Sequence, residues 1–346
     1  MKVGSVCYAT KQGLGYLAKD FFDHGVIDEV LVFQHPGGKP TELDWFPGAP
    51  VLTGRPFRSP TVDHFLGRIQ ACVFFETPFD WTFPLACRER NVRTVMVPMY
   101  EWFPDRKEYR SLFDQYLCPS LLDLEVFRND GLRPPEFMQV PVDPSHWKLR
   151  EQAVRFLHNA GGVGSRNHKG TEELLKAIPL VKAPNVQFRI TSQTALLKKL
   201  LFNNPVANGD PRLYCTVEDI PRAELHTWGD VYVAPEKFNG LSLPLQEAFA
   251  AGMPVVTTDR FPMNSWLPKG LLVPAAETRK CRVMPGHLEI DEAVVEPQAI
   301  ADIIDAVAAT DIREMSLRGK AWGEENSWEK LAPKWREKLE ALCELR

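Results

Sequence analysis

The segment GDVYVAPEKFNGLSLPLQEAFAAGMPVVTTD, residues 229–259, carries most of the information about how this chain folds. It is typical of a buried strand, a turn at Gly240, a helix that ends before Gly252, and a second strand. A turn that opens a helix presents unbonded backbone N–H groups and the positive end of the helix dipole. Residues 229–259 therefore predict a phosphate-binding turn.

The same segment carries a carboxylate that can face this turn. Glu247 follows Gly240 by two helical turns, on the face that looks back toward the same pocket. A carboxylate there can accept hydrogen bonds from sugar hydroxyls, and a ligand with both phosphates and hydroxyls is a nucleotide sugar. We therefore expect the backbone of Gly240, Leu241 and Ser242 to hold phosphates and Glu247 to bind hydroxyls. A plain helix cap and a surface carboxylate are the alternatives.

The composition is that of a packed protein of 346 residues, long enough for two domains. Apolar residues make up 44% of the chain and the net charge is −4, which gives no electrostatic case for non-specific nucleic-acid binding. The seven cysteines are widely spaced without a CxxC pair, which favours reduced thiols over disulfides or zinc. Because it shows neither a signal peptide nor a membrane-length apolar run, the chain is expected to be soluble and cytoplasmic.

Short apolar strands alternate with helices along the chain. In the first half, strands are expected at 3–8, 30–33, 71–76 and 94–98. This alternation indicates an α/β fold with a parallel sheet covered on both faces. The pattern restarts at 154–158 after a proline-containing connection, so we place the domain boundary near 146–152. The expected domains are 1–148 and 149–327, followed by a helix over 328–346.

In order and spacing, residues 229–259 resemble a signature of the GT-B glycosyltransferases of retaining family 4, also called glycosyltransferase group 1. That signature reads roughly Ala-Asp-Val-Phe-Val-x-Pro, then Glu-Gly-Phe-Gly-Leu-Pro, a second Glu eight residues after the first, and a final Gly-x-Pro-Val-Val-x-Thr-Asp. The matching positions here are Asp230, Pro235, Gly240, Leu243, Pro244, Glu247, Ala251, Gly252, Pro254 and Asp259.

The resemblance implies a GT-B architecture, in which two Rossmann-like domains face each other across a cleft. Residues 1–148 would form the acceptor domain and residues 149–327 the donor domain, while the helix over 328–346 would cross back to the first domain. The implied reaction moves a sugar from a nucleoside-diphosphate sugar to an acceptor hydroxyl with retention of configuration. It uses neither a metal nor another cofactor.

One departure from the family signature matters for donor binding. The first Glu, which contacts the transferred sugar in relatives, is replaced by Asn239. Asparagine keeps hydrogen-bonding capacity but carries no charge. Glu236 lies three residues earlier and can compensate, so both residues are candidates for donor binding.

Two cations lie on a second glycine turn, GSRNHKG, residues 164–170. By the resemblance, Lys169 and Arg166 would neutralise the diphosphate as it leaves, and charge stabilisation of this kind is often the largest catalytic effect. The alternative is a solvated loop that carries ordinary basic residues.

Two further stretches are donor-binding candidates by resemblance. Gly13 and Gly15 match the family's N-terminal glycine loop. Thr216 and Val217 follow a predicted strand and would hold the donor base through their backbone. For these two residues a simple strand-to-helix turn, capped by Asp219, is the alternative.

On the acceptor side, two carboxylates come at the ends of predicted strands. Glu76 ends one strand and Glu101 follows another. The carboxyl ends of parallel strands are where open α/β sheets bind ligands. Because no histidine lies at such an end, Glu76 and Glu101 are our candidates for polarising the acceptor hydroxyl. Structural caps or salt bridges are the alternative.

The sequence leaves three functions open. The first is a glycosyltransferase that acts on a saccharide or a small molecule. The second is a phage-type glycosyltransferase that acts on a hydroxylated nucleobase in DNA, against which the acidic net charge argues. The third is a non-catalytic protein that binds a nucleotide sugar, which only Asn239 favours.

Overall fold

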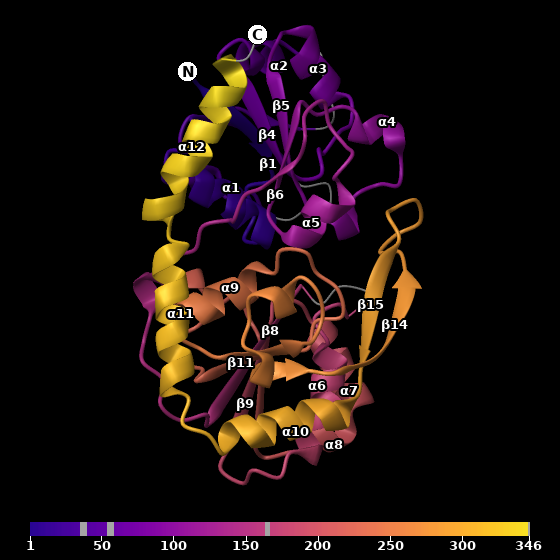
Figure 1. The fold of residues 1–346 in the computed structure, drawn as a ribbon, viewed down its shortest axis with the longest axis vertical. Coiled ribbons are helices and arrows are strands. Elements are labelled where there is room, and N and C mark those ends of the chain that lie inside the picture. Colours follow the sequence, from indigo (N-terminus) through magenta and orange to yellow (C-terminus); the bar gives the residue numbers. More distant parts are fainter. Residues whose placement is uncertain (35–39, 54–58, 163–166, 345–346) are drawn as a thin grey trace. The chain divides into compact units, whose positions relative to one another are not determined.

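The computed structural model divides the chain into two α/β units (Figure 1). Unit 1 comprises Met1–Pro141, Met284–Leu288 and Trp328–Arg346, and unit 2 comprises Val142–Val283 and Glu289–Ser327. Each unit contains a parallel sheet, which confirms the predicted α/β class. The residues that the structure describes are 1–34, 40–53, 59–162 and 167–344.

In the described part of unit 1, seven parallel strands form one sheet in the order β3-β2-β1-β4-β5-β6-β7. The strands are β1 (Val3–Cys7), β2 (Glu29–Phe33), β3 (Val51–Leu52), β4 (Ala71–Glu76), β5 (Arg93–Pro98), β6 (Gln115–Cys118) and β7 (Glu136–Phe137). The central strands β1, β4 and β5 are buried along almost their full length. Such apolar runs are expected where helices cover both faces of a sheet.

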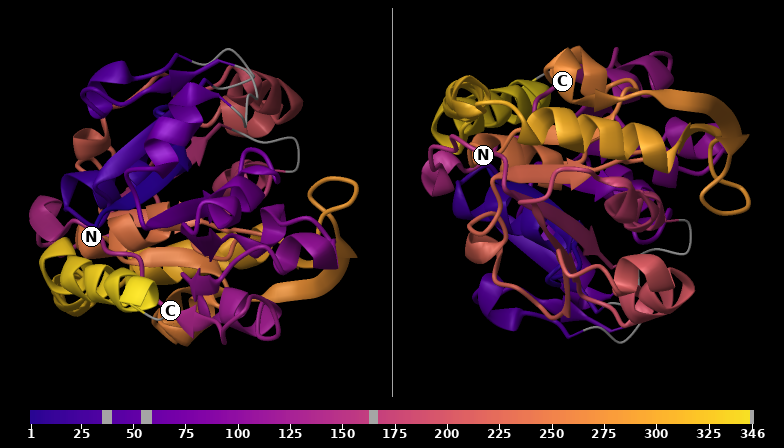
Figure 2. Two further views of the ribbon diagram at one scale, coloured as in Figure 1. Left: turned by 90° about the horizontal axis from the view of Figure 1, so that it is seen from above. Right: turned by 90° about the horizontal axis from the view of Figure 1, so that it is seen from below.

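Helices cover the sheet of unit 1 (Figure 2). They are α1 (Gly13–Asp23), α2 (Pro60–Leu66), α3 (Phe83–Glu89), α4 (Lys107–Arg110), α5 (Leu121–Val126) and the C-terminal α12 (Trp328–Glu344). The aromatic ring of Phe21 on α1 packs edge-on against Trp328 and Trp335 of α12, with centroids 5.2 and 4.9 Å away. Trp335 also donates its indole N–H to the Gln139 carbonyl at 2.9 Å. Burial of these aromatic rings holds α12 in unit 1.

The described part of unit 2 has a parallel sheet of six strands in the order β10-β9-β8-β11-β12-β13. These are β8 (Arg155–Gly161), β9 (Gln187–Ser192), β10 (Leu213–Val217), β11 (Val231–Ala234), β12 (Val255–Thr258) and β13 (Leu272–Val273). Two antiparallel strands, β14 (Ala275–Cys281) and β15 (Ile290–Val295), form a separate two-stranded sheet.

Both faces of the unit 2 sheet are buried under helices. On β11, Val231 and Val233 belong to one apolar cluster, whereas Tyr232 and Ala234 belong to another. Because successive strand residues point to opposite faces, the two clusters lie on opposite sides of the sheet. The helices are α6 (Thr171–Ala177), α7 (Leu196–Asn203), α8 (Pro205–Asn208), α9 (Leu243–Ala250), α10 (Pro297–Ala308) and α11 (Arg313–Glu325). The strand, turn, helix and strand predicted for residues 229–259 are thus confirmed as β11, α9 and β12.

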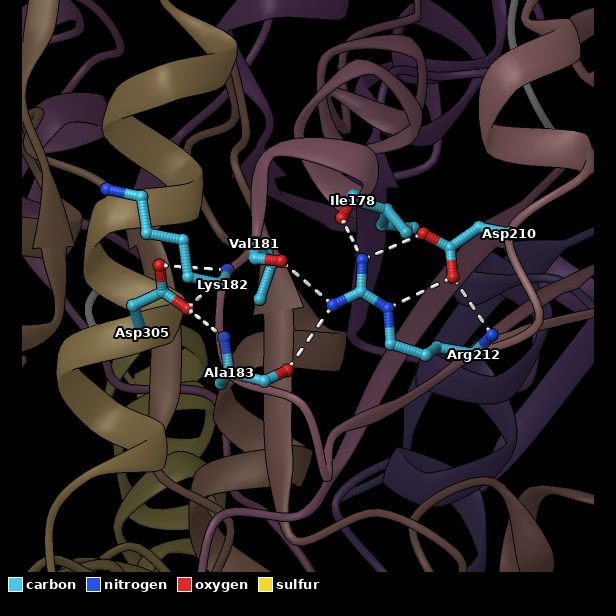
Figure 3. A network of polar contacts seen from close by, with 7 residues as sticks. All are labelled: Ile178, Val181, Lys182, Ala183, Asp210, Arg212 and Asp305. Carbon is cyan, nitrogen blue, oxygen red and sulfur yellow. Dashed lines mark hydrogen bonds and ion pairs between the residues drawn. The ribbon is translucent and has the colours of Figure 1, made fainter.

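One half-buried ion pair organises the connection between α6 and β9 (Figure 3). The Arg212 guanidinium binds the Asp210 carboxylate at 2.8 and 3.0 Å. It also donates to three backbone carbonyls of the connection, those of Ile178 at 2.8 Å, Val181 at 2.9 Å and Ala183 at 3.3 Å. Asp305 on α10 accepts the N–H groups of the same connection. Arg212 therefore supplies hydrogen bonds to the Val181 and Ala183 carbonyls and a second donor to the Ile178 carbonyl, which also accepts the Val181 N–H.

We predict that Arg212→Ala lowers the free energy of unfolding of unit 2 by about 2–3 kcal/mol, because it removes a donor from each of those carbonyls and the cation that pairs with the Asp210 carboxylate. The side chain is only 20% exposed, so solvent screens little of this loss. Denaturant unfolding followed by tryptophan fluorescence measures the effect. Arg313→Ala, which removes an arginine that is 53% exposed in its pair with Glu151, is the control and should change stability by less than about 0.5 kcal/mol. Equal effects would contradict the prediction.

Candidate functional site

The donor-side candidates in unit 2 gather at the carboxyl edge of its parallel sheet. β8 ends at Gly161, β10 at Val217 and β11 at Ala234. Lys169 follows the end of β8, and Glu236 follows the end of β11. This edge is where open α/β sheets bind ligands.

The turn that carries Lys169 is packed against the segment after β11. Gly170 has a φ of 68°, and a Cβ atom there would collide with the Pro235 carbonyl and lie 2.8 Å from the proline ring. The Lys237 N–H also donates to the His168 carbonyl at 2.7 Å. Only glycine fits this left-handed, crowded position. The resulting close approach fixes Lys169 relative to Glu236.

The charges of two carboxylates act on the Lys169 ammonium group. The group is half-buried, and Nζ donates to the Asn159 carbonyl at 3.3 Å. Burial lowers the pKa of Lys169, whereas the nearby carboxylates of Glu236 and Glu247 act to raise it. The structure therefore brings Lys169, Glu236 and Glu247 together. Arg166, the second cation expected on this turn, lies outside the described residues.

The turn before α9 is built from two departures from the family signature. Counted from Asn239, Ser242 stands at the second glycine of Glu-Gly-Phe-Gly, and it keeps a left-handed φ of 45°. Its hydroxyl donates to Oε1 of the buried Glu236 at 2.8 Å, and its N–H donates to Asn239 Oδ1 at 2.9 Å. Of the three predicted phosphate donors, Gly240, Leu241 and Ser242, the last is therefore engaged by Asn239.

Glu247 lies on α9 beside Arg222. Oε1 of Glu247 accepts from Nε and Nη2 of Arg222 at 3.1 and 2.5 Å. The Glu247 side chain is 17% exposed and that of Arg222 is 28% exposed. No pattern in the sequence marks Arg222, because it lies in a loop between two strands.

The remaining donor-binding candidates belong to other elements. Thr216 and Val217 end the edge strand β10, and Val217 is 38% exposed. Gly13 and Gly15 belong to unit 1, where they open α1. A side chain at Gly15 would collide with the Thr10 carbonyl, so this glycine permits a tight approach of α1 to the preceding loop.

Three carboxyl groups come together in unit 1. Glu76 ends β4, Glu101 lies in the 3₁₀ helix Tyr100–Trp102, and Asp123 lies in α5. Burial and the charge of Glu101 raise the pKa of Glu76 to about 8. The same two causes raise the pKa of Asp123 to about 8, although hydrogen bonds from Ser120 and the Tyr100 N–H oppose the shift. The structure thus brings the predicted pair, Glu76 and Glu101, together and adds Asp123.

These pKa shifts predict how the stability of unit 1 changes with pH. In the folded chain Glu76 keeps its proton up to about pH 8, whereas an unfolded glutamate loses it near pH 4.3. Because the folded state binds the extra proton, the free energy of unfolding should fall as pH rises from about 4.5 to 8 and level off above. Denaturant unfolding across this range should show a weaker pH dependence in Glu76→Gln, while Glu125→Gln, which removes an exposed carboxylate, should match the wild type. Identical slopes in all three proteins would contradict the prediction.

Histidine contributes a structural contact to unit 2. The His158 ring bridges strands and helix, with Nδ1 2.6 Å from the Val233 carbonyl and Nε2 2.8 Å from the Thr171 hydroxyl. Burial lowers its pKa to about 4, so the ring is neutral.

Across the described ranges, no group of three or more His, Cys, Asp or Glu side chains is placed to hold a metal ion. Nor does that part of the chain contain a helix long and apolar enough to cross a membrane.

Residues 156–281, which include the whole Lys169, Glu236 and Glu247 group, match the family model described as Glycosyl transferases group 1. These residues form a glycosyltransferase domain. A comparison with curated proteins finds no match.

Several solved structures share the fold of this chain. An Anabaena HepE structure in complex with UDP and glucose is 14% identical, with a TM-score of 0.74 over 99% of this chain and 100% of that one. A glycosyltransferase from Rickettsia africae is 12% identical, with a TM-score of 0.71 over 100% and 99% of the two chains. Sucrose-phosphate synthase from Thermosynechococcus elongatus is 13% identical, with a TM-score of 0.68 over the full length of both. At these identities the likeness shows a shared fold, here GT-B.

Proposed function

We propose that this glycosyltransferase moves a sugar from a nucleoside-diphosphate sugar to an acceptor hydroxyl, with retention of configuration and without a metal. The observation that carries the proposal is the convergence of the Lys169 cation on Glu236 and Glu247 at the carboxyl edge of the unit 2 sheet. This arrangement offers one positive charge for a diphosphate and two carboxylates for hydroxyls. The HepE structures with UDP, glucose and UDP-glucose support a uridine nucleotide sugar as the donor.

Each donor group has a proposed partner in unit 2. Lys169 binds the diphosphate and stabilises the charge that develops as it leaves, assisted by Arg166 and by the turn before α9. Glu247 accepts the ribose hydroxyls, and the backbone of Thr216 and Val217 holds the base. Glu236 takes over the contact to the transferred sugar from the glutamate that Asn239 replaces. Its carboxylate is 1% exposed and is oriented by the Ser242 hydroxyl.

The proposed chemistry is a front-face displacement. The bond between the anomeric carbon and the diphosphate oxygen breaks while the acceptor oxygen attacks from the same face. The acceptor proton passes to the leaving diphosphate, so no protein base is needed.

The chain's reduced cysteines, inferred from their spacing, suit a cytoplasmic enzyme.

The acceptor side of the proposal rests on unit 1. With a pKa of about 8, Glu76 is mostly protonated at neutral pH, so it would donate a hydrogen bond rather than take a proton. Glu101 is then the carboxylate that accepts from an acceptor hydroxyl. A polyhydroxylated acceptor, such as a saccharide, would use both roles.

Thermal unfolding in the presence of UDP, GDP, ADP and UDP-glucose tests the donor site. One nucleoside diphosphate should raise Tm selectively, and Lys169→Ala and Glu247→Ala should each abolish this rise. Arg313→Ala, far from the group in sequence and paired with Glu151, should keep it. Absence of any nucleotide-dependent rise in the wild type would overturn the proposal.

A further inference from the structure

Arg222 donates hydrogen bonds from two nitrogen atoms to one oxygen of Glu247. It lies in the 3₁₀ helix Arg222–Glu224, between β10 and β11. Both Nε and Nη2 donate to Oε1, at 3.1 and 2.5 Å. Two bonds to a single oxygen hold Oε1 in place, and they leave the lone pairs of Oε2 for other donors.

A second cation competes for the same carboxylate. Glu247 lies close enough to Lys169 for its charge to act on that ammonium group. If Arg222 were absent, Glu247 could turn toward Lys169, and the pair would neutralise each other. The contact with Arg222 therefore keeps Glu247 available to hydroxyls and Lys169 available to an anion.

A buried polar atom beside this pair also points to a ligand. His226 is 7% exposed, and its Nε2 has no hydrogen-bond partner among the residues that the structure describes. The charges of Glu247 and Arg222 both act on the pKa of the His226 ring, so the ring lies near them. Buried polar atoms rarely stay unpaired, and a polyhydroxylated ligand could satisfy this one.

We propose that Arg222 is a positioning residue for the donor ribose: it holds Glu247 so that Oε2 accepts the 2′- and 3′-hydroxyls of the nucleotide. This inference rests on the proposed function. It assigns the discrimination between ribonucleotide and deoxyribonucleotide to a contact within unit 2 that involves Arg222 and Glu247. It also explains why a carboxylate is tolerated next to the site of an anionic diphosphate, because Arg222 balances its charge.

Isothermal titration calorimetry with UDP and GDP, each beside its 2′,3′-dideoxy analogue, tests the proposal. The wild type should bind the ribose form about 10-fold or more tightly, the scale of a hydrogen bond to a charged group. Arg222→Gln should bring this ratio close to one, and Arg222→Lys should restore part of it. In a Glu247→Gln background, Arg222→Gln should have no further effect on the ratio.

Controls separate this inference from the proposed function. Arg313→Gln removes another ion-paired arginine of unit 2 and should keep the wild-type ratio. If the wild type binds a nucleoside diphosphate and Arg222→Gln and Arg222→Lys both keep the full ratio, Arg222 does not position Glu247, although the proposed function stands. If the wild type binds neither UDP nor GDP, nor their analogues, the proposed function fails and this inference fails with it.

Discussion

Replacement of Lys169 by alanine is expected to lower the turnover number for donor cleavage about 10²–10³-fold, the usual loss when one preorganised electrostatic group is removed. Lys169 is half-buried and the charges of Glu236 and Glu247 act on it, so solvent screens its charge poorly. In the proposed reaction the negative charge of the diphosphate grows as the sugar departs. Lys169 would stabilise that charge more than it stabilises the bound donor, which makes kcat the sensitive quantity.

Hydrolysis of UDP-glucose, followed by release of UDP, measures this effect without a known acceptor. Lys237→Ala is a matched control, because Lys237 lies just after β11 but pairs with Glu173 at 2.7 Å and with Glu292 at 3.9 Å. Its kcat should fall less than about 10-fold, since it acts on packing rather than on the leaving group. Lys169→Arg should keep part of the rate, because it preserves the charge but not its position. A Lys169→Ala enzyme as active as Lys237→Ala would rule out the electrostatic role.

The fold could be predicted because its signals are local. β11, α9 and β12 were each marked by an apolar run or by a glycine within a few residues. The alternation of such runs then required parallel strands with helical connections. These features depend on neighbouring residues alone, so one sequence is enough to reveal them.

Contacts in the site that join distant loops could not be predicted in the same way. Arg222 and Glu247 are 25 residues apart, and only the crossing from β10 through β11 to α9 brings them together. Asp123 was hidden for a different reason. In sequence it follows Ser120 as an ordinary helix-capping residue, and the Ser120 hydroxyl does accept its N–H at 3.0 Å. Its proximity to Glu101 depends on the packing of α5 beside the end of β5.

The turn before α9 couples two departures from the family signature, Asn239 and Ser242, to Glu236. The sequence identified Asn239 as a lost carboxylate and Glu236 as a possible replacement. The structure adds that Ser242 adopts a left-handed conformation, which costs a non-glycine residue on the order of 1 kcal/mol. The hydrogen bond from the Ser242 hydroxyl to Glu236 offsets this cost. It also orients the Glu236 carboxylate, the proposed replacement. A comparison of residue types cannot show such coupling, because it depends on the backbone conformation.

Gly170→Ala is expected to destabilise unit 2 by about 3 kcal/mol or more, through backbone strain and a forced separation of two packed segments. The φ of Gly170 is 68°, and the new Cβ would run into the Pro235 carbonyl. Because Pro235 is in a backbone segment that continues directly into Glu236, the clash cannot be relieved by rotating a side chain. Either the turn at 167–170 or the segment after β11 must move.

Movement of the turn and movement of the segment after β11 have different consequences. Denaturant unfolding combined with nucleotide binding distinguishes the two movements. If the turn moves, Lys169 leaves Glu236, so the surviving folded protein should lose the nucleotide-dependent rise in Tm as well as stability. Gly162→Ala is the matched control, because a Cβ atom at Gly162 meets nothing within 4 Å and its stability should change by less than about 0.5 kcal/mol. An alanine tolerated equally well at both positions would mean that the turn does not depend on its contact with Pro235. The geometry that presents Lys169 to the diphosphate would then have to come from the ligand rather than from the fold.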